Sequence, residues 1–125
     1  MPLGAAMYYQ NNSPGPETNT FAGTVVLANT NNLIPGLNLV GSTAPVGGNA
    51  ESTNFTLPFI SGDQLYLWKP DGSGFTIAYY NGPNDWLDGL TFNSIPAPNL
   101  TVGSGFYYQN NSPGAETWKQ NVVVP

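Results

Sequence analysis

The sequence predicts an all-β fold: an antiparallel β-sandwich of the jelly-roll type, with long loops and a duplicated terminal β-hairpin. Three observations support this prediction. No ten-residue window free of Gly, Pro and Asn clusters repeats apolar residues at helical spacing. Short β-branched and aromatic runs alternate with turn residues, which is typical of strands. One aromatic segment followed by a turn occurs near both ends of the 125-residue chain.

The clearest predicted hairpin lies in the middle of the chain. A Pro-Asp-Gly-Ser-Gly turn joins two strand-like runs: residues 64–69, 70–74 and 75–80. Pro presets φ for the first turn position, and Gly accepts the positive φ that closes the turn. Alternation places Leu65 and Leu67 on one face of the first strand, and Tyr66 and Trp68 on the other. Because both faces are apolar, we expect a central strand between two packed layers.

Weaker patterns predict the remaining elements. Three further runs have strand character: residues 23–28, 37–41 and 54–59. Pro58 confines the last of them to a sheet edge, because proline lacks an N–H for the ladder. Residues 42–52 are polar and rich in Gly, which indicates a long loop. Residues 81–85 form a turn and residues 95–98 an extended connector.

The duplicated segment is the strongest signal in the sequence. Residues 7–18 recur as residues 106–117, with ten of twelve positions identical and an offset of 99 residues. We call them the N-terminal copy and the C-terminal copy. Each copy is expected to form an aromatic strand, a tight Asn-Asn-Ser-Pro-Gly turn and a second strand. The expected second strands are residues 20–27 and 117–124.

Three interpretations of this duplication are open. The chain holds one domain and the tail of a preceding tandem unit, or the copies fill equivalent sites within and between subunits, or they flank one core as a pseudo-twofold. We favour the second, with residues 1–23 as a docking hairpin and residues 24–125 as a single β-sandwich domain. Donor-strand-like exchange of this kind does not close on itself, so it builds a filament. The expected assembly interface consists of Tyr8, Tyr9, Gln10, Asn11, Phe21, Val25, Val26, Tyr107, Tyr108, Trp118, Val122 and Val123.

Composition excludes several classes of function. Two cations stand against seven carboxylates, the net charge is -5, and 7% of residues are charged. Two cations cannot neutralise a nucleic-acid backbone or hold an anionic membrane surface, and no apolar run is long enough to insert into a bilayer. Without Cys and His the chain has no zinc site, thiolate nucleophile or Ser-His-Asp triad. We therefore expect a protein that is not an enzyme and has no cofactor.

Two carboxylates flank a tryptophan in the segment Asn-Asp-Trp-Leu-Asp-Gly. Asp85 and Asp88 lie on either side of Trp86. Such a pair can serve as a glycosidase acid and base, or as half of a calcium loop. The alternating oxygen ligands of an EF-hand loop are missing, so structural use of these carboxylates is favoured, with calcium as the remaining metal candidate.

The same region holds the best candidates for a ligand-binding rim. Tyr79, Tyr80 and Trp86 lie beside the turn that contains Asn84. Flat rings cover the apolar face of a pyranose, and amide groups pair with its hydroxyls, so this set is suited to an extracellular glycan. Large rings also fill the core of a small β-sandwich, and that use is expected for most aromatic residues of the chain.

Five segments made of turn glycines and core aromatics carry a resemblance to a known family: residues 33–42, 62–68, 75–79, 102–110 and 116–118. Their order is similar to that in uncharacterised secreted β-domains of environmental bacteria, which often lie near the C-terminal ends of exported proteins. The resemblance covers roughly residues 24–124 and leaves out the N-terminal copy. It implies an exported, β-rich, non-catalytic domain with an extracellular or cell-surface location.

The sequence therefore predicts a non-enzymatic, exported structural protein that assembles head-to-tail into an extracellular filament or surface layer. Its partner would be a second copy of itself. The alternative is a carbohydrate-binding module with an aromatic rim site. A nearly uncharged exterior rich in Asn and Thr favours association, because few charges must be desolvated when subunits pack.

Overall fold

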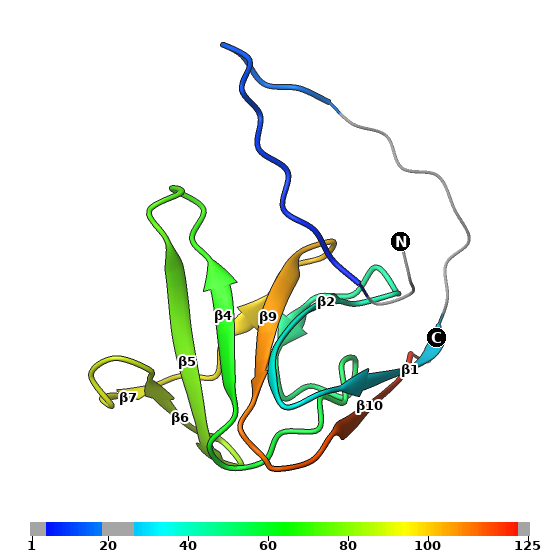
Figure 1. Ribbon diagram of the computed structural model, residues 1–125, viewed down its shortest axis with the longest axis vertical. Coiled ribbons are helices and arrows are strands. Elements are labelled where there is room, and N and C mark those ends of the chain that lie inside the picture. Colours follow the sequence, from blue (N-terminus) through cyan, green and yellow to red (C-terminus); the bar gives the residue numbers. More distant parts are fainter. Residues whose placement is uncertain (1–4, 19–26, 123–125) are drawn as a thin grey trace.

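The computed structural model describes residues 5–18 and 27–122 (Figure 1). Within these ranges the chain is all-β, as predicted, and its strands form three antiparallel sheets. The strands are β1 (Ala28–Leu33), β2 (Gly36–Gly41), β3 (Gly48–Asn49), β4 (Gln64–Trp68), β5 (Phe75–Gly82), β6 (Asp85–Asp88), β7 (Ser94–Ile95), β8 (Asn99–Leu100), β9 (Gly105–Asn110) and β10 (Glu116–Asn121). The described residues include no helix that could cross a membrane.

The main sheet has six strands in the order β2-β9-β4-β5-β6-β7. The predicted hairpin is confirmed as β4–β5, with Trp68 opposite Phe75 across the turn. Strand β4 lies between β9 and β5, so its expected central position is also confirmed. The expected second packed layer on the outer face of β4 is missing, however, since Trp68 on that face is 49% exposed.

Strands β9 and β10 do not form the expected hairpin. β9 pairs with β2 in the main sheet, whereas β10 pairs with β1 in a separate two-stranded sheet. The chain therefore changes sheets at the Asn-Asn-Ser-Pro-Gly turn, and residues 34–35 make the matching change between β1 and β2 (Figure 1). The C-terminal copy is a corner between two sheets. The expected strand at residues 20–27 lies almost entirely outside the described residues.

The hydrophobic core forms where the main sheet faces β10 and residues 42–59. Phe59 stacks on Tyr80 and Tyr108, with ring centroids 5.0 and 5.5 Å apart. From the opposite side, Trp118 donates its indole N–H to the Phe55 carbonyl. The buried core consists of Leu33, Val40, Ala50, Phe55, Leu65, Ala78, Tyr80, Trp86, Leu100, Phe106, Tyr108 and Trp118.

The predicted strand at residues 54–59 is wrong. The Phe55 and Thr56 N–H groups both bond to the Ser52 carbonyl, and Thr56 has a φ of 52°, so the backbone turns here. The alternating apolar residues still point inward, with Phe55 buried and Phe59 half-buried, but from an irregular segment. Residues 42–52 form the expected long loop, apart from the short strand β3.

Candidate functional site

A single asparagine holds the corner of the C-terminal copy. The buried Asn110 accepts the Ser112 N–H through Oδ1, at 2.8 Å. Its Nδ2 group donates to the Gly114 carbonyl within the turn and to the Leu33 carbonyl at the end of β1, both at 2.9 Å. Asn110 therefore shapes the turn and ties it to the neighbouring strand.

Next to the corner lies a buried group of two carboxyls and one phenol. The Tyr108 hydroxyl lies 2.6 Å from Asp63 Oδ2 and 2.9 Å from Glu116 Oε2. A phenol has a single hydrogen to donate, so two ionised carboxylates cannot both be satisfied by it. With Glu116 protonated, all three groups are satisfied, because Glu116 donates to the Tyr108 hydroxyl and Tyr108 donates to Asp63.

The electrostatics of this group agree with that arrangement. Burial, and then the contact with Asp63, raises the pKa of Glu116 to about 7. Burial also raises the pKa of Tyr108, so its phenol keeps its proton. Asp63 acts as an acceptor for two backbone groups as well, the N–H of Asn111 at 3.0 Å and the N–H of Ile60 at 3.1 Å.

The N-terminal copy has the same internal hydrogen bonds as the C-terminal copy. Tyr9, the counterpart of Tyr108, lies 2.9 Å from Glu17 Oε2. Asn11 accepts the Ser13 N–H at 2.8 Å and donates to the Gly15 carbonyl at 2.9 Å. The sequence identity of the two copies is thus matched by the same local turn conformation.

The two copies differ in their surroundings. Tyr9 is 64% exposed, whereas Tyr108 is fully buried, and residues 7–18 are all exposed. Beyond residues 5–9, the N-terminal copy projects away from the sheets (Figure 1). It therefore lacks the partners that the fold gives to the C-terminal copy. These partners are the Asp63 carboxylate and the backbone carbonyls of Leu33 and Gly62. We call them, together with the position between β2 and β4 that β9 occupies, the receptor slot.

This difference gives a matched pair of substitutions. Asn110→Ala is expected to lower the free energy of unfolding by about 1–3 kcal/mol, because it leaves buried backbone groups without partners. Asn11→Ala removes the same turn bonds in an exposed copy and should change the free energy of unfolding by less than about 0.5 kcal/mol. Urea unfolding of the two variants measures both values, and equal losses would contradict the assignment of Asn110 as the anchor.

The structure separates the predicted interface residues into three groups. Tyr9, Gln10 and Asn11 are exposed, and Tyr8 lies against the outer face of the main sheet. In the C-terminal half, Tyr108 and Trp118 are core residues, whereas Tyr107 and Val122 are half-buried. The other predicted interface residues lie outside the described part of the chain: Phe21, Val25, Val26 and Val123.

The expectation of an exposed aromatic rim around Asn84 is wrong for two of its three rings. Tyr80 and Trp86 are buried, because strand alternation directs them toward the core. Trp86 donates its indole N–H to Glu51 Oε2 at 2.8 Å, and the Asn84 N–H also points to Glu51, at 3.1 Å. Tyr79 lies on the opposite face and is half-buried. These four residues do not converge on a common surface.

The two carboxylates considered for calcium serve separate turns. Asp85 accepts the amide of Asn81 at 2.6 Å. Asp88 accepts the N–H groups of Leu90 and Thr91 at 2.8 and 2.9 Å. The bonds from Thr91 and then Leu90 lower the pKa of Asp88. Within residues 5–18 and 27–122, no three Asp or Glu side chains gather into a group that could hold a metal ion.

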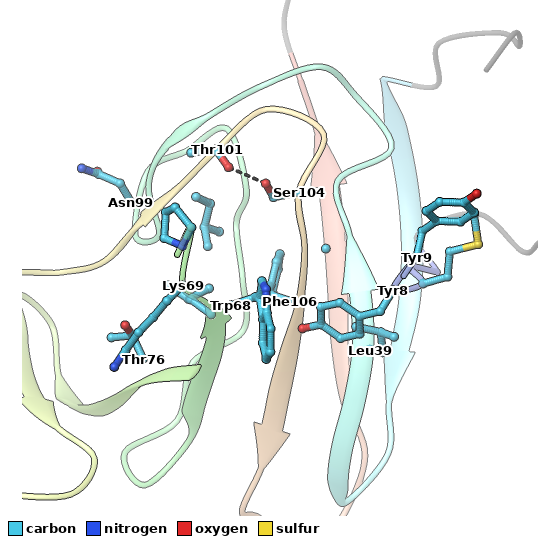
Figure 2. Close-up of a pocket in the computed structure, with 15 residues that line it drawn as sticks. Tyr8, Tyr9, Leu39, Trp68, Lys69, Thr76, Asn99, Thr101, Ser104 and Phe106 are labelled. Carbon is cyan, nitrogen blue, oxygen red and sulfur yellow. Dashed lines mark hydrogen bonds between the residues drawn. The ribbon is translucent and has the colours of Figure 1, made fainter. Parts of the chain in front are cut away.

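A cleft that the sequence did not predict opens between β4 and β9. The ladder between these strands ends at Tyr66 and Tyr107, and a cavity of about 440 Å³ lies beyond that point (Figure 2). Leu67 and Trp68 line one side, and Phe106 lines the other. The other lining residues come from the N-terminal segment, from strands β2, β5, β8 and β9, and from nearby loops: Met7, Tyr8, Tyr9, Leu39, Lys69, Pro70, Thr76, Asn99, Leu100, Thr101, Ser104 and Gly105.

Comparison with known proteins gives no relative for this chain. No protein-family model, no curated protein and no solved structure matches it. The family resemblance therefore stays a prediction, and the function must be argued from the residues themselves.

Proposed function

We propose that the chain is a non-enzymatic structural protein that assembles head-to-tail. In the assembly, the N-terminal copy of one chain takes the place of residues 106–117 in the next chain. The observation that supports this proposal is that the exposed copy has the turn of the buried copy already formed and lacks only the receptor slot.

The residues of the N-terminal copy suit the slot position by position. Ala6 of the incoming chain would occupy the place of Gly105. A Cβ added at Gly105 would lie 2.4 Å from the Cβ of Ala6 in the same chain, and the next residue that it would meet is Val40, whose carbonyl oxygen would be 3.5 Å away. Alanine therefore fits once that N-terminal segment has left. Met7 would replace the buried Phe106 with another large apolar side chain, whose flexibility helps it to fill an irregular space.

The exchange requires that the C-terminal copy of the receiving chain first leaves the receptor slot. Each chain has two copies and one slot, and the slot is filled by its own C-terminal copy. The identity between the copies ends at Thr18 and Thr117, and the next residue of the buried copy is the core residue Trp118, where the N-terminal copy has Asn19. The closed chain is thus the favoured monomer, and assembly begins with opening of the β9–β10 corner.

The proposal includes finer features of the fold and location. The packing of β10 and residues 42–59 against the main sheet supports a sandwich-like architecture of the jelly-roll type. The extracellular location, as a filament or surface layer, rests on the family resemblance and on the low charge of the chain. Donor-strand-like exchange supplies the partner, which is a second copy of the chain.

Engineered cysteines test the exchange directly, because the natural chain has none. Leu37 lies opposite Gln109 in the β2–β9 ladder, and Gln10 is the counterpart of Gln109. Opposed residues of an antiparallel pair are close enough for a disulfide. The double variant Gln10→Cys/Leu37→Cys is therefore expected to give a ladder of disulfide-linked oligomers on a non-reducing gel after slow oxidation at high protein concentration.

Two further variants serve as controls. Gln109→Cys/Leu37→Cys should close within one chain and run as a monomer, which shows that the position 37 thiol reacts. Deletion of residues 1–19 should leave a folded monomer and abolish the fibres that electron microscopy is expected to show for the full chain. Monomers alone from the Gln10→Cys/Leu37→Cys variant, or fibres from the deletion variant, would contradict the proposal.

A further inference from the structure

The outer face of the main sheet carries an aromatic platform made of Trp68, Phe75 and Tyr107, from three adjacent strands. The centroid of the Phe75 ring lies 5.0 Å from that of Trp68 and 5.8 Å from that of Tyr107. The Tyr8 ring contacts all three, with centroids 5.9 to 6.0 Å away. Trp68 remains 49% exposed and Tyr8 46% exposed, so both rings present free surface at the mouth of the cleft.

Trp68 and Tyr8 are both about half exposed and their rings are in contact, so together they offer a flat apolar surface that a ligand can cover. Figure 2 shows the Trp68 and Phe106 rings side by side, followed across the cleft by the Tyr8 ring and Leu39. The cavity of about 440 Å³ lies within the range of small-molecule sites, about 300–1,000 Å³. The cleft is thus large enough for a ligand that covers the Trp68 ring.

The polar groups around the rings are almost all uncharged. Asn99, Thr76, Thr101 and Ser104 contribute one amide and three hydroxyls, and the two hydroxyls of Thr101 and Ser104 bond to each other (Figure 2). Lys69 is the one cation, and none of the described residues that line the cleft is Asp or Glu. Hydroxyls and amides both donate and accept hydrogen bonds, as the hydroxyls of a sugar do.

We propose that, in the unassembled chain, this cleft binds a neutral pyranose unit of a glycan, stacked on the exposed part of the Trp68 ring beside Tyr8. The ring face of a pyranose is apolar, so it buries the exposed surface of Trp68, while its hydroxyls pair with those of Thr101 and Ser104. The site is distinct from the surface around Tyr79, where the Tyr79 ring contacts Phe92 and not Trp68.

The three tryptophans make the binding observable. Trp86 and Trp118 are each 1% exposed, so Trp68 is the tryptophan that a solute in water can reach. Acrylamide should quench the fluorescence of Trp68 in the free chain, and a bound glycan should protect it. This signal reports on the cleft itself.

The experiment uses the full chain with laminarin and cello-oligosaccharides as neutral probes and polygalacturonate as an acidic one. We expect retarded migration in gels that contain a neutral glycan, together with protection of Trp68 from acrylamide. Trp68→Ala and Tyr8→Ala should each weaken binding by about tenfold or more, because each removes a ring that buries the sugar. Phe92→Ala, which removes an exposed ring outside the cleft, should bind as the unmodified chain does.

Three results would overturn the assignment. The first is that the unmodified chain binds none of the neutral probes at millimolar concentration. The second is that Trp68→Ala binds them as tightly as the unmodified chain does. The third is that the chain binds polygalacturonate alone and that Lys69→Gln abolishes this binding, which would show that the site recognises a carboxylate. Because the substituted rings are about half exposed, each variant should keep its fold, and circular dichroism of each variant checks this.

Discussion

Trp118→Ala is expected to lower the free energy of unfolding by about 3–5 kcal/mol, the usual cost of deleting a large buried ring. Trp118 is 1% exposed, and its ring lies 6.2 Å from that of Phe106. Its indole N–H also satisfies the Phe55 carbonyl, which the substitution would leave without this partner. Because the ring joins the β1–β10 pair to residues 42–59, its loss should loosen the whole corner.

Urea unfolding followed by far-ultraviolet circular dichroism measures this effect. Trp68→Ala is the matched control, since it deletes the same side chain from a half-exposed position. It should cost only about 1 kcal/mol, because the half-exposed ring loses edge contacts with Phe75 and Tyr8 and leaves no buried cavity. Similar losses for the two variants would show that Trp118 is not the central residue of the core that its burial indicates.

The free energy of unfolding is expected to fall between pH 5 and pH 8, by about 2 kcal/mol. In the folded chain the pKa of Glu116 is raised to about 7, mainly by burial, whereas in the unfolded chain it returns to its ordinary value near 4.5. Between these two values the folded state holds one more proton than the unfolded state. Stability from this group is therefore complete below pH 4.5 and is lost as the pH rises through 7.

Glu116→Gln isolates this contribution, because an amide donates to the Tyr108 hydroxyl at every pH. The variant should show a nearly flat dependence between pH 5 and pH 8. Glu17→Gln is the matched control, since Glu17 makes the same contact to Tyr9 in the exposed copy, and it should keep the slope of the unmodified chain. An unchanged slope in Glu116→Gln would contradict the shared proton. The lowered pKa values of Asp71 and Asp88 act only in the acid range, below this window.

The β4–β5 hairpin could be predicted because its information is local. The Pro-Asp-Gly turn and the alternation around Leu65 lie within one short stretch of sequence. The corner could not be predicted, because every partner of β9 and β10 is distant in sequence: β4 and β2 pair with β9, and β1 pairs with β10, all of them more than forty residues earlier. A local pattern identifies two strands and a turn, and it does not say whether the strands pair with each other or with others.

The missed elements have equally physical causes. β1 has the sequence Ala-Asn-Thr-Asn-Asn-Leu, in which Leu33 is the one buried residue, so no apolar alternation identifies it. Asp63 is a single carboxylate before β4, and its role depends on a tyrosine 45 residues away. The shared spacing of Tyr and Glu in both copies was the available clue to this buried group. The cleft depends on where two non-adjacent strands stop pairing, which no local pattern records.

The order of the copies along the chain has a consequence for synthesis. During synthesis the N-terminal copy precedes the strands of the receptor slot, and β9 and β10 follow those strands. β1 begins ten residues after Thr18, so any pairing of the N-terminal copy with β1 would be local, and local contacts form faster than the distant pairing of β1 with β10. Until residue 121 emerges, the N-terminal copy is the available match for the open slot. It would act as a placeholder that shields β2 and β4 from other chains, until Trp118 arrives and the permanent corner displaces it.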